Sequence, residues 1–87
     1  MTEYDLIAFV SPNAAIAAQD LLEGVCPFQV MPVLREISTG CGIALRVSPA
    51  HLAAARAALT ASSLAADGYR FFSVSGSGPT LTVNPLP

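Results

Sequence analysis

The chain has few basic residues. It has no lysine, and its four arginines, at positions 35, 46, 56 and 70, are scattered among 87 residues with a formal net charge of −2. A protein that binds nucleic acid needs clustered cations against the phosphate backbone. The sequence therefore predicts that nucleic acid is not a partner.

Long apolar runs are also missing. The opening MTEYDLIAFV has no basic residues before its apolar segment, and no later stretch reaches the about 18 consecutive apolar residues of a membrane span. We therefore expect neither a signal peptide nor a membrane partner, and we expect a cytoplasmic protein.

Residues that bind metals or form disulfides are rare. One histidine, His51, and two cysteines, Cys26 and Cys41, show no ligand spacing and are too few for a closed zinc site or a disulfide scaffold. We expect no metal and no cofactor. In a reducing compartment both cysteines stay thiols, so their reactivity becomes the question.

What the chain does have is material for one core, since 53% of its residues are hydrophobic and 11% are charged. β-branched and aromatic runs predict strands over residues 4–10, 28–33, 42–48 and 69–74. Apolar periodicity predicts helices over residues 13–23 and 50–62, each preceded by a Ser-Pro pair, Ser11-Pro12 and Ser48-Pro49, that suits a helix start. In the first helix the expected buried stripe is Ala14, Ala17, Ala18, Leu21 and Leu22.

This order of elements predicts an α+β, ferredoxin-like βαββαβ fold, a four-stranded antiparallel sheet with two helices on one face. An open sheet of another strand order is the alternative. We expect a carrier-like domain over residues 1–74, with Pro32 placing the second strand at a sheet edge or marking its end. Residues 75–87 form a Gly/Ser/Pro-rich C-terminal tail, read as a turn plus a short extended piece, with an added edge strand as the less favoured alternative.

The segment LREISTGCGIALRV places Cys41 between Gly40 and Gly42. In the expected fold this loop lies at the end of the sheet where the first helix begins, near Ser11, Pro12 and Asn13. A helix N-terminus and the nearby Arg35 would both favour a thiolate, and the glycines would expose the sulfur and permit unusual backbone angles. The alternative, without a reactive role, is that Cys41 is a small apolar residue at the start of a strand.

Other candidate residues have simpler interpretations. Cys26, between the first helix and the second strand, is expected at the opposite end as a packing residue. Arg35 and Glu36 form either a solvated pair or an anion-binding pair. His51, Arg46 and Arg70 are expected to be solvated, and the distance from Cys41 to His51 disfavours a Cys-His nucleophilic pair.

The runs FVSPNAAIAAQDLL, LREISTGCGIALRVSPAHLAAA and GYRFFSV resemble the small bacterial selenium/sulfur carrier protein-like family over about residues 4–74. The family pattern is Pro-Arg-Glu, a serine two positions on, then Cys-Gly and a strand of small apolar residues. It is matched here by Arg35, Glu36, Ser38, Cys41, Gly42 and Ala44. Leu34 replaces the proline, and Pro12 and Asn13 stand where members commonly have one or two histidines.

The resemblance implies a carrier of sulfur or selenium on the Cys41 thiolate, which is not an enzyme and whose partners are donor and acceptor proteins. Arg35 would stabilise anionic forms, Glu36 and Ser38 would shape the loop, and Gly40 and Gly42 would give access. The resemblance leaves open whether the protein forms a homodimer. The alternative is a ligand-binding or oligomerisation module without thiol chemistry. A redox sensor is a weaker option, because the second cysteine it needs nearby, Cys26, is expected at the other end.

Overall fold

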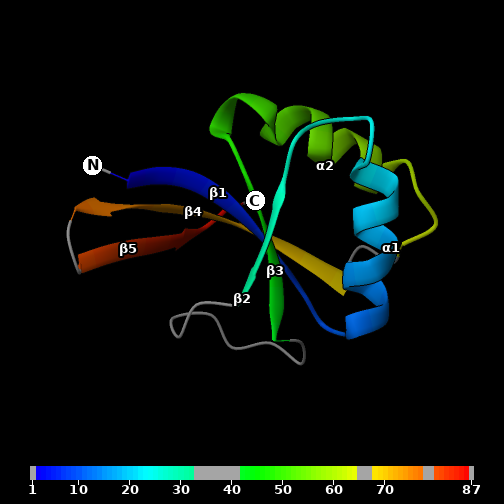
Figure 1. The fold of residues 1–87 in the computed structure, drawn as a ribbon, viewed down its shortest axis with the longest axis horizontal. Helices are drawn as coiled ribbons and strands as arrows, with labels where there is room; N and C mark the ends of the chain where they lie inside the picture. Colours follow the sequence, from blue (N-terminus) through cyan, green and yellow to red (C-terminus); the bar gives the residue numbers. More distant parts are fainter. Residues whose placement is uncertain (1, 33–41, 65–67, 78–79, 87) are drawn as a thin grey trace.

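The computed structural model describes residues 2–32, 42–64, 68–77 and 80–86 (Figure 1). These residues form five strands, two helices and a short 3-10 helix. Their order is β1 (Thr2–Phe9), α1 (Pro12–Leu22), β2 (Gln29–Pro32), β3 (Ile43–Val47), η1 (Pro49–His51), α2 (Leu52–Thr60), β4 (Tyr69–Ser77) and β5 (Thr80–Pro85).

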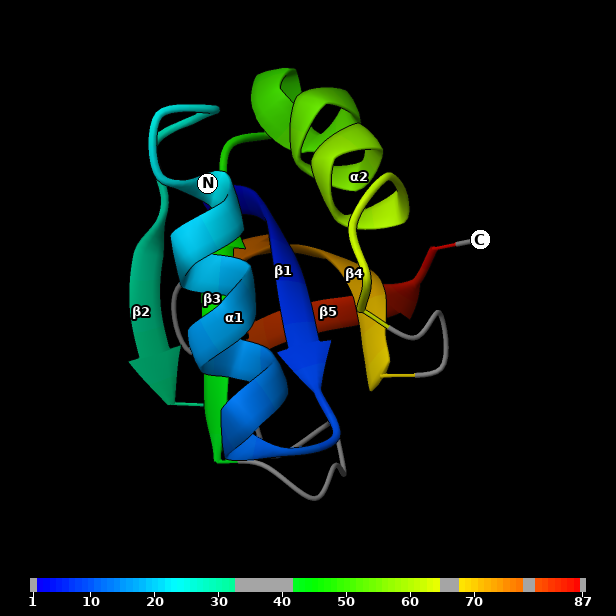
Figure 2. The same cartoon turned by 90° about the vertical axis from the view of Figure 1, so that its right-hand side faces the viewer.

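The strands form one sheet in the order β2-β3-β1-β4-β5, and every neighbouring pair is antiparallel. Figure 2 shows both helices on the same side of this sheet. The expected α+β class is confirmed. The expected ferredoxin-like sheet of four strands is met only in part, because the described residues build a sheet of five strands.

Both Ser-Pro pairs begin helical segments, as the sequence predicts. The Ser11 hydroxyl accepts a hydrogen bond from the Ala14 amide at 3.2 Å, and the Ser48 hydroxyl accepts one from the Ala50 amide at 3.3 Å. A capping oxygen of this kind satisfies an amide that would otherwise lack a partner at the helix start. After Ser48 the chain first forms η1, and α2 begins at Leu52.

The buried face of α1 differs from the expected stripe. The fully buried positions are Ala15, Ala18 and Leu22, whereas Leu21 keeps 36% of its surface exposed. Because α1 is apolar almost all round, its periodicity could not distinguish between faces only one residue apart. Gly24, just beyond the helix, has a φ of +86° and thus takes the left-handed conformation that the sequence predicts there.

Apolar side chains are buried on both faces of the sheet. The face that carries the helices holds the larger cluster, which includes Ile7, Phe9, Ala15, Ala18, Leu22, Leu45, Val47, Ala55 and Leu59. The opposite face holds a smaller cluster of Tyr4, Leu6, Ala8, Ala44 and Val74. Burial on two faces explains why β1 is a nearly continuous apolar run rather than an alternating one.

The C-terminal segment corrects a sequence expectation. β4 continues to Ser77, and β5 pairs with it from Ser77↔Thr80 to Phe72↔Pro85. Val83 stands opposite Val74 and packs against the smaller cluster. The added edge strand is therefore the correct alternative. It forms because backbone pairing along the extended β4 adds to the small area that a short strand buries alone.

One acidic side chain lies inside the fold. Asp5 of β1 is 6% exposed and shares its face of the strand with Ile7 and Phe9, beneath the helices. Burial raises the pKa of its carboxyl group, while the positive charge of Arg56 acts in the opposite sense. Since the pKa is higher in the folded state, folding favours the protonated acid. The stability gained from protonation is present at low pH and is lost as the pH rises through the folded pKa.

We therefore expect Asp5→Asn to raise the free energy of unfolding at pH 7 by roughly 1 kcal/mol, because it removes a buried charge. The gain should shrink as the pH falls toward about 4, where an unperturbed aspartate becomes protonated. Urea unfolding of both proteins at the two pH values tests this. Asp20→Asn, on the exposed side of α1, serves as the control and should change little. A loss of stability in Asp5→Asn at both pH values would contradict the prediction.

Candidate functional site

The loop that carries Cys41 connects β2 to β3. Arg35, Glu36, Ser38, Gly40 and Cys41 lie outside the described residues, so their expected positions stay predictions. The two ends of the loop are described. Pro32, the last residue of the edge strand β2, pairs with Ile43, the first residue of β3. Cys41 directly precedes Gly42, the first residue of the described segment 42–64.

The register of the sheet places this loop relative to α1. Ala44 of β3 pairs with Ala8 of β1, and β1 ends one residue later at Phe9. α1 begins at Pro12, so the start of β3 and the start of α1 lie at one end of the sheet (Figure 2). The order of the elements in the sequence predicts this placement for the two ends of the loop.

The start of α1 offers few free amides. Pro12 has no N–H, the Ala14 amide donates to the Ser11 hydroxyl, and the Ala15 amide donates to the Ser11 carbonyl. Asn13 is left as the amide of the first turn that has no partner within the described residues. The helix terminus can therefore supply one hydrogen-bond donor and its partial positive charge to an anion.

Gly42 is exposed, and a Cβ atom built on it would meet no atom within 4 Å among the described residues beyond its chain neighbours. Its φ is not in the left-handed region, which within the described residues is occupied by Gly24 and Gly76. The expected use of an unusual backbone angle is therefore wrong for Gly42. Gly42 thus provides an exposed position without a side chain, directly after Cys41 in the sequence. Ala44, the other described position of the motif, is buried against the smaller cluster.

Cys26 has the properties of a packing residue, as expected. Its side chain is 9% exposed within the larger cluster, and burial raises the pKa of its thiol. A buried thiol with a raised pKa is a poor nucleophile. Cys26 directly precedes Pro27, which lines a cavity together with His51, so both residues lie at the end of the sheet opposite the loop.

The described residues contain no group of three or more His, Cys, Asp and Glu side chains that could hold a metal ion. None of the described helices has the length and apolar character needed to cross a membrane.

Two residues that the sequence suggested were solvated have more specific surroundings. The guanidinium carbon of Arg46 lies 4.3 Å from the centre of the Tyr4 ring. His51 is half-buried, and its Nδ1 is buried without a hydrogen-bond partner in the described part of the chain. The contact between Arg46 and Tyr4 follows from the strand register. Arg46 pairs with Leu6, so Tyr4 is its diagonal neighbour on the same face.

A scan of family models matches residues 3–70 to the family described as Putative Se/S carrier protein-like. The chain belongs to this family. The match includes the whole loop from β2 to β3, and thus Cys41 and the other motif positions. Comparison with curated proteins and with solved structures gave no match.

Proposed function

We propose that this Se/S carrier-like protein holds one sulfur or selenium atom on the thiolate of Cys41 and passes it between partner proteins. The family match over residues 3–70 carries the proposal. The described geometry supports it. Both ends of the loop lie at the end of the sheet where α1 starts, and Gly42, the residue after Cys41, is exposed.

Uptake and delivery of the sulfur atom each take one exchange reaction, in which one thiolate replaces another on that atom. The Cys41 thiolate attacks the outer sulfur of a donor persulfide, a bond forms between the two sulfur atoms, and the bond inside the donor breaks. The electron pair of that bond leaves on the donor's thiolate. A thiolate of the acceptor repeats the step on the outer sulfur of Cys41, so the carrier returns to its starting state and no net oxidation occurs.

We assign separate roles to the motif residues. Arg35 and the start of α1 stabilise the anionic forms of Cys41, because a positive charge and a free amide favour thiolate over thiol. Gly40 and Gly42 give a partner's active site access to the sulfur, and Glu36 and Ser38 shape the loop. The protein acts as a cytoplasmic carrier for donor and acceptor proteins rather than as an enzyme.

Intact mass spectrometry after incubation with glutathione persulfide tests the proposal. We expect the mass to rise by one sulfur atom, the added atom to be removed by dithiothreitol, and peptide mapping to place it on Cys41. Free glutathione, which has no outer sulfur to transfer, is the matched control and should leave the mass unchanged. An unmodified protein, or an added sulfur on the buried Cys26, would contradict the proposal and favour a binding module without thiol chemistry.

A further inference from the structure

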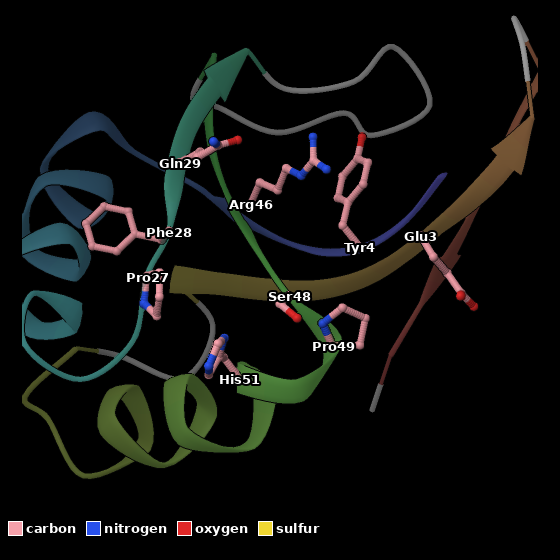
Figure 3. Close-up of a pocket in the computed structure, with 9 residues that line it drawn as sticks. All are labelled: Glu3, Tyr4, Pro27, Phe28, Gln29, Arg46, Ser48, Pro49 and His51. Atoms are coloured by element: carbon pink, nitrogen blue, oxygen red, sulfur yellow. The ribbon is translucent and has the colours of Figure 1, made fainter. Parts of the chain in front are cut away.

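A cavity of about 520 Å³ lies at the end of the sheet opposite the Cys41 loop, among the start of β2, the end of β3 and η1 (Figure 3). Small-molecule sites in proteins commonly span about 300 to 1,000 Å³ and combine apolar walls with a few polar groups. This cavity has that composition. Pro27, Phe28 and Pro49 contribute apolar surface, and Tyr4 contributes its ring.

Arg46 is the cation of this cavity. Its guanidinium lies over the Tyr4 ring, with 4.3 Å between the guanidinium carbon and the ring centre. Within the described residues Arg46 donates no hydrogen bond and pairs with no carboxylate. The aromatic contact restrains the planar group, while its N–H donors stay available to a ligand. Figure 3 shows the guanidinium beside the Tyr4 ring, with the Gln29 side chain on the neighbouring strand.

His51 adds a second polar group. It lies at the start of α2, where its side chain makes no capping hydrogen bond, and its Nδ1 is buried without a protein partner in the described part of the chain. A buried polar atom without a hydrogen bond is unfavourable for the fold, and this marks the His51 side of the cavity as polar. The Ser48 hydroxyl, on the same wall, already accepts from the Ala50 amide and stays available as a donor.

The charges around the cavity select among anions. Arg46 provides one positive charge, and the exposed Glu3 on the rim provides one negative charge that disfavours a second negative charge on the ligand. The fork of a guanidinium matches a planar carboxylate through two parallel hydrogen bonds. The apolar walls suit a flat or branched hydrocarbon body.

We infer that this cavity binds a small monocarboxylate with an aromatic or apolar body, with its carboxylate on Arg46. The site is separate from sulfur carriage, because it lies at the other end of the sheet and uses none of the motif residues. Carriage and ligand binding can therefore be tested independently.

NMR titration of the 15N-labelled protein with phenylacetate tests the inference. We expect saturable shifts at Gln29, Arg46 and His51, and much weaker binding of phenylacetamide, which has the same body without the charge. Arg46→Gln should weaken phenylacetate binding by about tenfold or more, since it removes a charge-assisted hydrogen bond. The exposed Arg70, on β4 and outside this cavity, provides the matched control Arg70→Gln, which should bind like the wild type.

Three outcomes would overturn the inference. Absence of saturable binding would remove the site, and equal binding of phenylacetamide would remove the role of Arg46. Tighter binding of phenyl phosphate than of phenylacetate would replace the monocarboxylate with a dianion. Because Arg46 is exposed, its replacement should not disturb folding, and the amide spectrum of the variant checks this directly.

Discussion

Cys41→Ser is expected to abolish the uptake of sulfur from a persulfide donor and its transfer to an acceptor thiol. A serine hydroxyl is far less acidic than a thiol, so at neutral pH it offers no anion to attack the outer sulfur of the donor. The fold should be unaffected, because serine and cysteine have nearly the same shape and the described pairing of β2 with β3, from Gln29↔Arg46 to Pro32↔Ile43, is made by other residues. Radioactive sulfur, followed from donor to carrier to acceptor, measures the loss.

Cys26→Ser is the matched control for that variant. Cys26 is buried in the larger cluster and its thiol has a raised pKa, so its loss should leave sulfur uptake unchanged. The substitution places a hydroxyl in an apolar environment, and some loss of stability is expected, of the order of 1 kcal/mol. If Cys26→Ser lost sulfur uptake while Cys41→Ser retained it, the carrier atom would have been assigned to the wrong cysteine.

The most accurate predictions rest on local signals in the sequence. Ser11 and Ser48 cap helical segments because a serine followed by proline satisfies the first amides whatever the rest of the chain does. Pro32 ends the edge strand β2 because it has no amide to donate to a further neighbour. These effects depend on a few adjacent residues, so no knowledge of the tertiary structure is needed.

Features that depend on distant contacts were predicted less well. β5 forms because β4 continues to Ser77 and offers a partner, which the composition of residues 75–87 does not reveal. The second apolar cluster, on the face without helices, follows from β1 lying in the middle of the sheet with neighbours on both sides. Burial on both faces of the sheet also explains why Tyr4 is buried. Nothing next to Tyr4 in the sequence indicates that Arg46 contacts its ring.

The same distinction applies to the two candidate sites. The topology of the first strands and helix was sufficient to place the ends of the Cys41 loop beside the start of α1. The cavity at the other end could not be predicted, because its lining comes from three separate segments, residues 3–4, 27–29 and 46–51. Their proximity depends on the register between β2 and β3 and on the path of η1, neither of which leaves a pattern in the sequence.

Arg35 is the second residue whose replacement is expected to have a large effect. The structure restricts the other source of positive potential for Cys41, because Pro12 lacks an N–H and the Ala14 amide already donates to Ser11. The start of α1 therefore has the Asn13 amide and a partial charge to offer, within the described residues. We therefore expect the full positive charge of Arg35 to make the larger contribution to stabilising the thiolate.

Arg35→Ala should raise the pKa of Cys41, lower the thiolate fraction at neutral pH and slow sulfur uptake by about tenfold. The rate of alkylation by iodoacetamide, measured as a function of pH, reports the pKa directly. Arg35→Lys keeps the positive charge and should stay close to the wild type, which separates the effect of charge from the shape of the side chain. A pH profile that Arg35→Ala leaves unmoved would contradict this role, and activation of Cys41 would then rest on the start of α1 alone.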